Sequence, residues 1–133
     1  MILSFLTLDE ALALHADQNR RYGGEGGLLH LNLLGSAFAT PKATFDSNYL
    51  HPTIFEMAAA YLFHTCQNHP FIDGNKRTSL AASLAFLWMN DYEVIADLDA
   101  LTELVLGVAR GEVTKADLAV FLRENSMQAA AAS

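Results

Sequence analysis

The sequence predicts an all-α fold in which about six helices surround a central buried helix, and three observations lead to this prediction. The segment 80–89, LAASLAFLWM, is apolar except for Ser83, as expected of a helix that is enclosed on all sides. Helix-start signals stand before the first and last helical patterns, at Thr7 and Thr114. No segment shows a convincing strand pattern.

The first part of the chain predicts two helices with a loop between them. Thr7 and Glu10 have the spacing of a capping box, which opens a helix that ends near Tyr22. Residues 23–27 contain four glycines and must form a loop. Residues 31–39 favour a short helix, which is stopped by the proline two positions further on.

The rest of the chain predicts a turn-like segment followed by four helices. Residues 42–50 are polar and offer short extended contacts at most. Pro52 suits the first position of a helix that continues to Asn68, and residues 69–73 connect it to the next. The remaining helices are expected at 74–90, which is the central helix, at 99–110, and from the cap at Thr114 to about Asn125.

Length and charge limit the classes of protein to which the chain can belong. Its 133 residues are expected to form one domain over residues 1–133, with one hydrophobic core and a frayed tail at 126–133. Apolar residues make up 52% of the chain, which argues against disorder. The net charge of −7 argues against direct nucleic-acid binding, because a phosphate backbone requires a basic protein face.

Cysteine usage and hydropathy bear on location. The single cysteine, Cys66, cannot form an internal disulfide, which fits a reducing cytoplasm. No uninterrupted apolar run is long enough to cross a bilayer, so no membrane span or membrane partner is expected. The apolar segment 1–6 lacks the charged start and the length of a signal peptide, and we expect it to dock on the fold. The sequence therefore predicts a cytoplasmic protein.

Residues 69–78, HPFIDGNKRT, are the most informative segment of the chain. They place an imidazole, a carboxylate, a glycine, an amide and two cations directly ahead of the apolar run. The N-terminal end of a helix attracts anions through its free backbone N–H groups and the positive end of its dipole. Lys76 and Arg77 add positive charge at this end. The segment therefore indicates a phosphate site with a histidine beside it and a carboxylate able to hold Mg²⁺.

The same segment matches the pattern His-x-Phe-x-Asp/Glu-Gly-Asn-x-Arg at every fixed position, and in this the chain resembles the Fic/Doc superfamily. Fic-type adenylyltransferases usually have glycine before the arginine, whereas Lys76 resembles the Doc (death-on-curing) branch. Segments 21–28 and 33–37 also resemble that branch, and a weaker similarity covers residues 7–125. The chain differs from the usual Doc pattern where relatives carry Arg, Asp and Glu, at Leu29, His30 and Gly35.

The resemblance implies a compact helical bundle and a role for each polar residue of the motif. It makes His69 the general base that takes the proton of an acceptor hydroxyl, and Asp73 the Mg²⁺ ligand. It assigns phosphate binding to their neighbours, Gly74, Asn75, Lys76 and Arg77. The residues alone leave simpler interpretations open, namely helix capping by the aspartate, a helix start at the asparagine and a solvated pair of cations.

Four other residues have mainly structural interpretations. Phe71 is expected to anchor the loop in the core, and Trp88 to lie in the core with the rest of its helix. His15 lies on one helical face with leucines and is expected in the core or in the wall of the cleft. Cys66 is expected to be buried as a small apolar residue rather than to act as a nucleophile.

The implied function is that of a Doc-like toxin from a toxin–antitoxin pair, which uses ATP and Mg²⁺ to transfer phosphate to a hydroxyl of a target protein. For Doc-like proteins the target would be a translation factor such as elongation factor Tu. A glycine at position 76 would let the α-phosphate sit in the anion site, whereas Lys76 fills that space, so γ-phosphate transfer is expected. Two alternatives stay open: Fic-type AMP transfer, favoured by Gly74, and a catalytically weak peptide-binding module, favoured by the changes at 29, 30 and 35.

Control of the activity is expected to come from a partner. Many Fic enzymes are silenced by a helix with the pattern Ser/Thr-x-x-x-Glu-Gly/Asn. Only Glu25 and Glu124 are followed by Gly or Asn here, and Arg21 and Val120 stand four positions before them. This chain therefore lacks the pattern, and a cognate antitoxin is expected to restrain it through a C-terminal segment that folds on binding.

Overall fold

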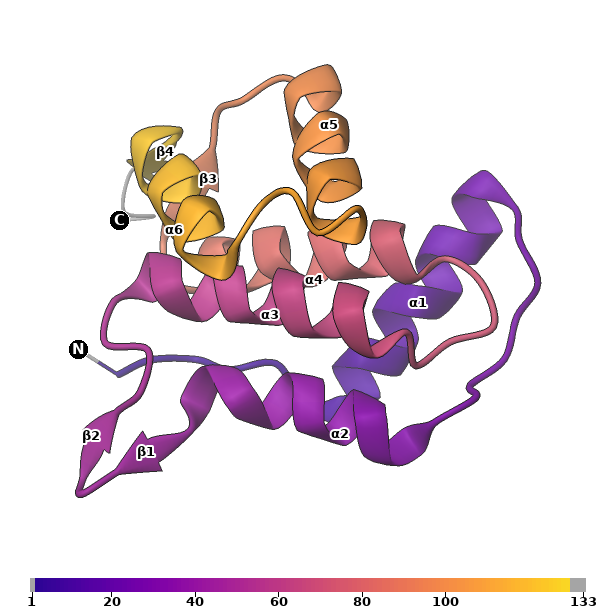
Figure 1. Ribbon diagram of the computed structural model, residues 1–133, viewed down its shortest axis with the longest axis horizontal. Helices are drawn as coiled ribbons and strands as arrows, with labels where there is room; N and C mark the ends of the chain where they lie inside the picture. The colour runs from indigo at the N-terminus through magenta and orange to yellow at the C-terminus, as the bar shows by residue number, and fades with distance from the viewer. Residues whose placement is uncertain (1, 130–133) are drawn as a thin grey trace.

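The computed structural model describes residues 2–129, and within them the predicted all-α fold is confirmed (Figure 1). Helices α3 and α4 lie side by side at the centre, α2 and α6 pack on α3, and α1 packs on α4. Among residues 2–129, no helix is both long and apolar enough to span a bilayer. The six α-helices of this part of the chain are α1 (Leu8–Tyr22), α2 (Leu31–Ala39), α3 (Ile54–Asn68), α4 (Asn75–Met89), α5 (Leu98–Ala109) and α6 (Lys115–Glu124).

Short strands form two antiparallel pairs, of which the sequence indicated only extended contacts within residues 42–50. A 3-10 turn, η1 (Thr40–Lys42), leads into β1 (Thr44–Phe45), which pairs antiparallel with β2 (Asn48–Tyr49). Further on, β3 (Tyr92–Val94) pairs antiparallel with β4 (Ser126–Gln128). The prediction of a frayed tail at 126–133 is therefore wrong for residues 126–128, because β4 finds backbone partners on β3; residues 130–133 lie outside the described part.

Reciprocal capping boxes fix the starts of three helices, and the Asp97 side chain alone caps α5. Thr7 with Glu10 and Thr114 with Asp117 form the capping interactions that the sequence predicts. For α3, the Thr53 hydroxyl accepts the N–H of the third helical residue at 3.1 Å, and that residue's carboxylate accepts the Thr53 N–H at 2.9 Å. The helix therefore begins after Thr53, and Pro52 precedes the cap instead of occupying the first helical position.

The most enclosed helix is α3, which contacts α2, α4, α5 and α6. Its Tyr61 is fully buried, and so is Phe86 of α4, so the core lies between these two helices. The far side of α4 is open: Trp88 is 63% exposed, and the prediction that it lies in the core is wrong. It lines a groove with Leu84 and Tyr92, because β3 covers this side of α4 only in part.

The N-terminal segment docks on the core, as the sequence predicts. Leu6 is buried, and its N–H donates a hydrogen bond of 3.0 Å to the hydroxyl of Tyr61. Burial raises the pKa of Tyr61 to about 12, so this hydroxyl stays protonated. The contact ties the segment before α1 to the middle of α3.

A pair of histidines beside α6 should make the fold sensitive to acid. Burial, then Lys115 and His51, lowers the pKa of His64 from 6.5 to about 4, and the Lys115 ammonium lies 3.1 Å from its Nε2. Between these pH values the imidazole binds a proton in the unfolded chain but not in the folded chain, so the free energy of unfolding decreases as pH falls through this window. Well above pH 6.5 the imidazole is neutral in both states, and this contribution is zero.

The measurement is urea unfolding of the wild type and of His64→Gln at about pH 7.5 and about pH 5. We expect the wild type to lose roughly 1 kcal/mol more than the variant on acidification, less than a full proton would give because solvent screens the partly buried ring. Equal losses in the two proteins would exclude His64 as a source of acid sensitivity.

Candidate functional site

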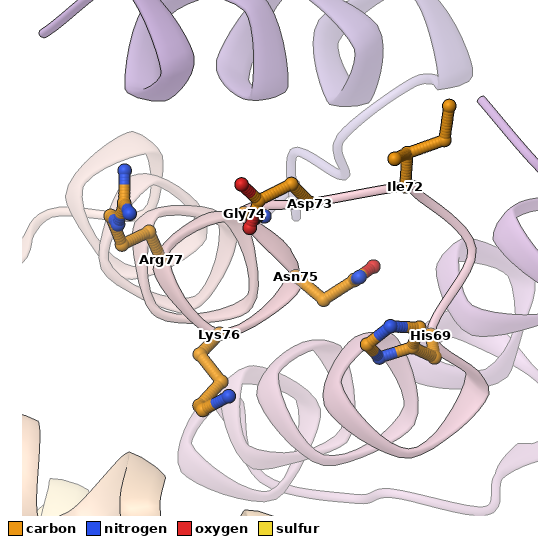
Figure 2. A pocket seen from close by; sticks show the side chains of 7 residues that line it. All are labelled: His69, Ile72, Asp73, Gly74, Asn75, Lys76 and Arg77. Atoms are coloured by element: carbon orange, nitrogen blue, oxygen red, sulfur yellow. Dashed lines mark hydrogen bonds between the residues drawn. The ribbon is translucent and has the colours of Figure 1, made fainter. Parts of the chain in front are cut away.

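The α3–α4 connection forms one wall of a cleft of about 270 Å³. His69 ends α3 in the left-handed region, with φ 50°, and Gly74 precedes α4 with φ 81°. These two turns bring the loop back over the first turn of α4 (Figure 2). The cleft is lined by His69, Ile72, Asp73, Gly74, Asn75, Lys76 and Arg77. The structure thus brings together all six residues for which the sequence predicts a role in the site.

The loop is held from inside by Asn75. Its side-chain oxygen accepts the N–H of Phe71 at 2.9 Å, and its amide donates to the carbonyl of Phe71 at 2.9 Å. Phe71 is fully buried, as expected of a loop anchor, and Asn75 is only 4% exposed. Both polar ends of the Asn75 side chain are therefore engaged by the loop, and what it offers to an anion is its backbone N–H in the first turn of α4.

Asp73 presents an ionised carboxylate at the cleft. The N–H of Gly74 at 2.7 Å, then that of Glu25 at 3.3 Å, holds the pKa of Asp73 below its usual value. The residue itself is exposed. Each carboxylate oxygen accepts one backbone hydrogen bond, so each keeps a lone pair for another partner. The capping interpretation is wrong, because Gly74 occupies the cap position of α4 and, of the N–H groups at this helix start, Asp73 accepts only that of Gly74 itself.

The glycine-rich loop after α1 lies against the α3–α4 connection at one end of the molecule (Figure 1, right). Leu28 pairs with Phe71 in an isolated β-bridge, and the N–H of Ile72 donates to the carbonyl of Gly27 at 3.1 Å. A Cβ at Gly24 would come within 2.9 Å of an Asp73 carboxylate oxygen. Only glycine fits this close approach, which sequence reasoning missed although four glycines in five residues hinted at it.

The two cations of the motif lie at the mouth of the cleft. Lys76 and Arg77 are exposed, and within residues 2–129 neither forms an ion pair. Arg77 donates to the carbonyl of Gly23 at 3.0 Å and lies 5.5 Å from the centre of the Tyr22 ring. Arg20 and Arg21, in contrast, both pair with Asp17 on α1. Within the described residues, the positive charges of Lys76 and Arg77 are therefore not neutralised by a carboxylate.

His69 completes the cleft from the end of α3. Its side chain is exposed, and among the described residues no hydrogen bond involves its imidazole. Cys66, one turn earlier, is buried as the sequence predicts, and burial raises the pKa of its thiol. The histidine is thus the group in this wall whose ring nitrogens are accessible to a substrate.

Comparisons with known proteins agree with this arrangement. The model of the Fic/DOC family matches residues 5–87. The chain is 34% identical over 115 residues to "Protein kinase doc" of Escherichia phage P1, which covers 86% of this chain and 90% of that protein. It is 40% identical over 78 residues to "Toxin Doc" of Mycolicibacterium smegmatis, which covers 59% of this chain and 60% of that toxin. The chain belongs to the Fic/Doc family.

Proposed function

We propose that this protein is a Doc-like toxin that transfers the γ-phosphate of ATP, with Mg²⁺, to a hydroxyl of a target protein. One observation carries the proposal: a single cleft at the N-terminus of a helix holds an ionised carboxylate together with an imidazole and two cations that form no hydrogen bond or ion pair with another side chain among residues 2–129. The two relatives named "Protein kinase doc" and "Toxin Doc" support the same conclusion.

The phosphate end of ATP fits the first turn of α4. The N–H groups of Asn75 and Lys76 have no partner within the helix, because they precede its first hydrogen-bonded turn. Gly74 lets this turn pack closely on α1, since a Cβ there would lie 2.7 Å from the side-chain oxygen of Asn19. In a protein with a net charge of −7, the exposed cations of Lys76 and Arg77 make this end a local site for a polyanion.

The residues present fit a magnesium ion that bridges the protein and the nucleotide. Mg²⁺ is usually held by one or two carboxylates together with substrate phosphates, and it prefers oxygen ligands. Asp73 offers such oxygens, ionised and exposed, beside the phosphate site. The ion would neutralise charge on the transferred phosphate.

His69 would act on the acceptor. Its ring takes the proton from the target hydroxyl as the hydroxyl oxygen bonds to the γ-phosphorus. The bond from that phosphorus to the bridging oxygen breaks at the same time, and ADP leaves. Positioning and charge do most of this work, so the N–H groups of α4 and the two cations carry the stabilisation of the transferred phosphoryl group.

AMP transfer is the second candidate, and a groove beside the cleft favours it. Lys76 and Arg77 line both hollows, and the second is otherwise mainly apolar, with Leu80, Thr102, Val105 and Leu106. A nucleoside in this groove would bring its α-phosphate nearest the cleft. Against this, the Lys76 side chain stands at the position where adenylyltransferases of the family usually have glycine.

The changes from the usual Doc pattern do not favour a mere binding module. Leu29 and His30 hold the motif loop through backbone N–H groups, which donate to the carbonyl of Pro70 at 2.8 and 3.0 Å. These bonds do not depend on the side chains. Gly35 lies on α2, and a Cβ there would meet nothing within 4 Å. The cleft therefore keeps its architecture with all three replacements.

We further propose that an antitoxin segment binds the groove between α1 and α4. The two helices run antiparallel, since Arg77 bonds to Gly23 while Met89 and Leu6 share a groove. This α1–α4 groove adjoins the hollow that holds Trp88. The charged residues that line the two are Glu10, Asp17 and Glu93, and Asp17 is already paired with Arg20 and Arg21. Because Glu10 and Glu93 remain, the segment should combine apolar and basic side chains. As the target of the transfer we propose a translation factor such as elongation factor Tu, which the resemblance to Doc-like proteins implies.

Bacterial growth tests the toxin proposal. Expression of the wild type should slow growth, expression of His69→Ala should not, and co-expression of the neighbouring small gene should restore growth to the wild-type strain. Trp88→Ala should remain toxic but escape this rescue, because exposed tryptophans often dominate binding energy.

The matched control is Val120→Ala, which truncates an exposed apolar residue on α6 and should leave both toxicity and rescue unchanged. Normal growth with abundant, soluble wild-type protein in several hosts contradicts the toxin proposal. Rescue of Trp88→Ala as complete as that of the wild type excludes this face as the antitoxin site.

A further inference from the structure

We propose that His15 is a positioning residue that fixes the orientation of the Asp73–Gly74 peptide, and through it both the carboxylate and the backbone donor of the cleft. The inference rests on the proposed function, because it concerns how the chain presents these groups to Mg²⁺ and a nucleotide. His15 lies on α1, 58 positions before Asp73, and no motif of the sequence includes it.

Two contacts connect His15 to the motif loop. Its Nε2 lies 2.7 Å from the backbone carbonyl oxygen of Asp73. Its ring stacks on Phe71, with the ring centres 3.7 Å apart and the planes 5° from parallel. His15 is 6% exposed, so water competes little for either contact. Because a carbonyl oxygen only accepts, Nε2 must carry a proton and donate it to this bond.

The Asp73–Gly74 peptide needs such a tie, because glycine leaves its orientation open. Gly74 adopts φ 81° and ψ 14°, and glycine accepts either sign of φ at little cost. A rotation of the peptide plane would exchange the directions of its carbonyl and its N–H. The planar trans peptide keeps these two groups pointing in opposite directions. A bond that holds the Asp73 carbonyl therefore also decides where the Gly74 N–H points.

That N–H is the group that orients the carboxylate. It donates to an Asp73 carboxylate oxygen at 2.7 Å and is the first cause of the lowered pKa of Asp73. His15 thus acts on the carboxylate through one peptide unit. Asn19, one turn further along α1, closes the same side: a Cβ on Gly74 would lie 2.7 Å from its side-chain oxygen. The face of α1 that carries His15 and Asn19 therefore packs directly against the turn before α4.

A purely structural role for His15 is the competing explanation, and its two contacts can be separated. His15→Phe keeps an aromatic ring to stack on Phe71 but removes the donor to Asp73. His15→Gln places an amide N–H at about the reach of Nε2 but removes the ring. If packing is the whole role, the phenylalanine variant should behave like the wild type and the glutamine variant should not.

The test measures thermal melting and the affinity for a non-hydrolysable ATP analogue with Mg²⁺, by titration calorimetry. We expect His15→Phe to melt close to the wild type but to bind about tenfold more weakly, as for one lost buried hydrogen bond. His15→Gln should melt earlier yet recover most of the affinity. His64→Phe, the same substitution on α3 away from the cleft, should bind like the wild type.

Wild-type affinity in His15→Phe together with weak binding by His15→Gln would overturn the inference. A measurement on the wild type alone covers the case in which the variants do not fold. Long-range ¹H–¹⁵N spectra report which ring nitrogen of His15 carries the proton, and a neutral ring protonated at Nδ1 would also overturn it. If the wild type binds no nucleotide, the proposed function fails, while the spectra still test the contact.

Discussion

Replacing His69 by asparagine should reduce the rate of phosphate transfer by about 10²–10⁴-fold, the usual contribution of a general base, while leaving the fold intact. Asparagine is the informative replacement because His69 ends α3 at φ 50° and ψ 55°, a left-handed conformation that asparagine adopts readily. The imidazole has no hydrogen bond within the described residues, so its loss leaves no buried group without a partner. Transfer rates and melting temperatures check both halves of the prediction.

His69→Ala serves as the comparison. It removes the same base but places alanine in the left-handed region, which costs roughly 1 kcal/mol of stability. Both variants should therefore be inactive, and the alanine variant alone should melt earlier. Undiminished transfer by purified His69→Asn would exclude the imidazole as the base and move the acceptor site elsewhere in the cleft.

Asp73→Asn should weaken the magnesium dependence of nucleotide binding, whereas Arg77→Ala should weaken binding with or without the metal. The asparagine keeps an oxygen for the N–H of Gly74 but loses the charge. Replacing a residue that only hydrogen-bonds to a metal ligand already lowers metal affinity about tenfold, so loss of the ligand's charge should lower Mg²⁺ affinity by at least that much. The arginine contributes charge directly to the phosphates, and its loss should weaken binding by about tenfold. Titrations with ATP in Mg²⁺ and in a chelator separate the two roles.

Glu25→Gln is the matched control for the loss of a negative charge. Its backbone N–H, not its side chain, contacts Asp73, so the contact survives the substitution. We expect this variant to bind magnesium and nucleotide like the wild type. Equal weakening by Glu25→Gln and Asp73→Asn would show that general charge, rather than a ligand, underlies the metal dependence.

Local patterns made most of the fold predictable. The capping signals at Thr7 and Thr114 give two helix starts correctly, because a cap is a contact over three residues and is written in the local sequence. The decapeptide 69–78 likewise contains all seven residues that line the cleft. The short helix 31–39 has the predicted bounds because a proline limits it.

What the sequence could not provide depends on pairing between distant segments. The bridge from Leu28 to Phe71 holds the glycine loop against the motif loop, and no local pattern encodes this long-range pairing. The contact of His15 with Asp73 spans 58 positions. Trp88 lies on an apolar helix, yet the arrangement of the neighbouring elements decides that its side stays open. The roles of such residues appear only when the helices are placed in space.

Label transfer from ATP tests the central claim most directly. The purified wild type and His69→Asn are incubated with Mg²⁺ and a bacterial lysate, with ATP labelled either at the γ-phosphate or at the α-phosphate. The account predicts that the wild type labels a protein from γ-labelled ATP only, and that the variant labels none. Label from α-labelled ATP only would replace phosphate transfer by AMP transfer, and no label from either ATP with active-site residues intact would contradict the assignment of a transferase.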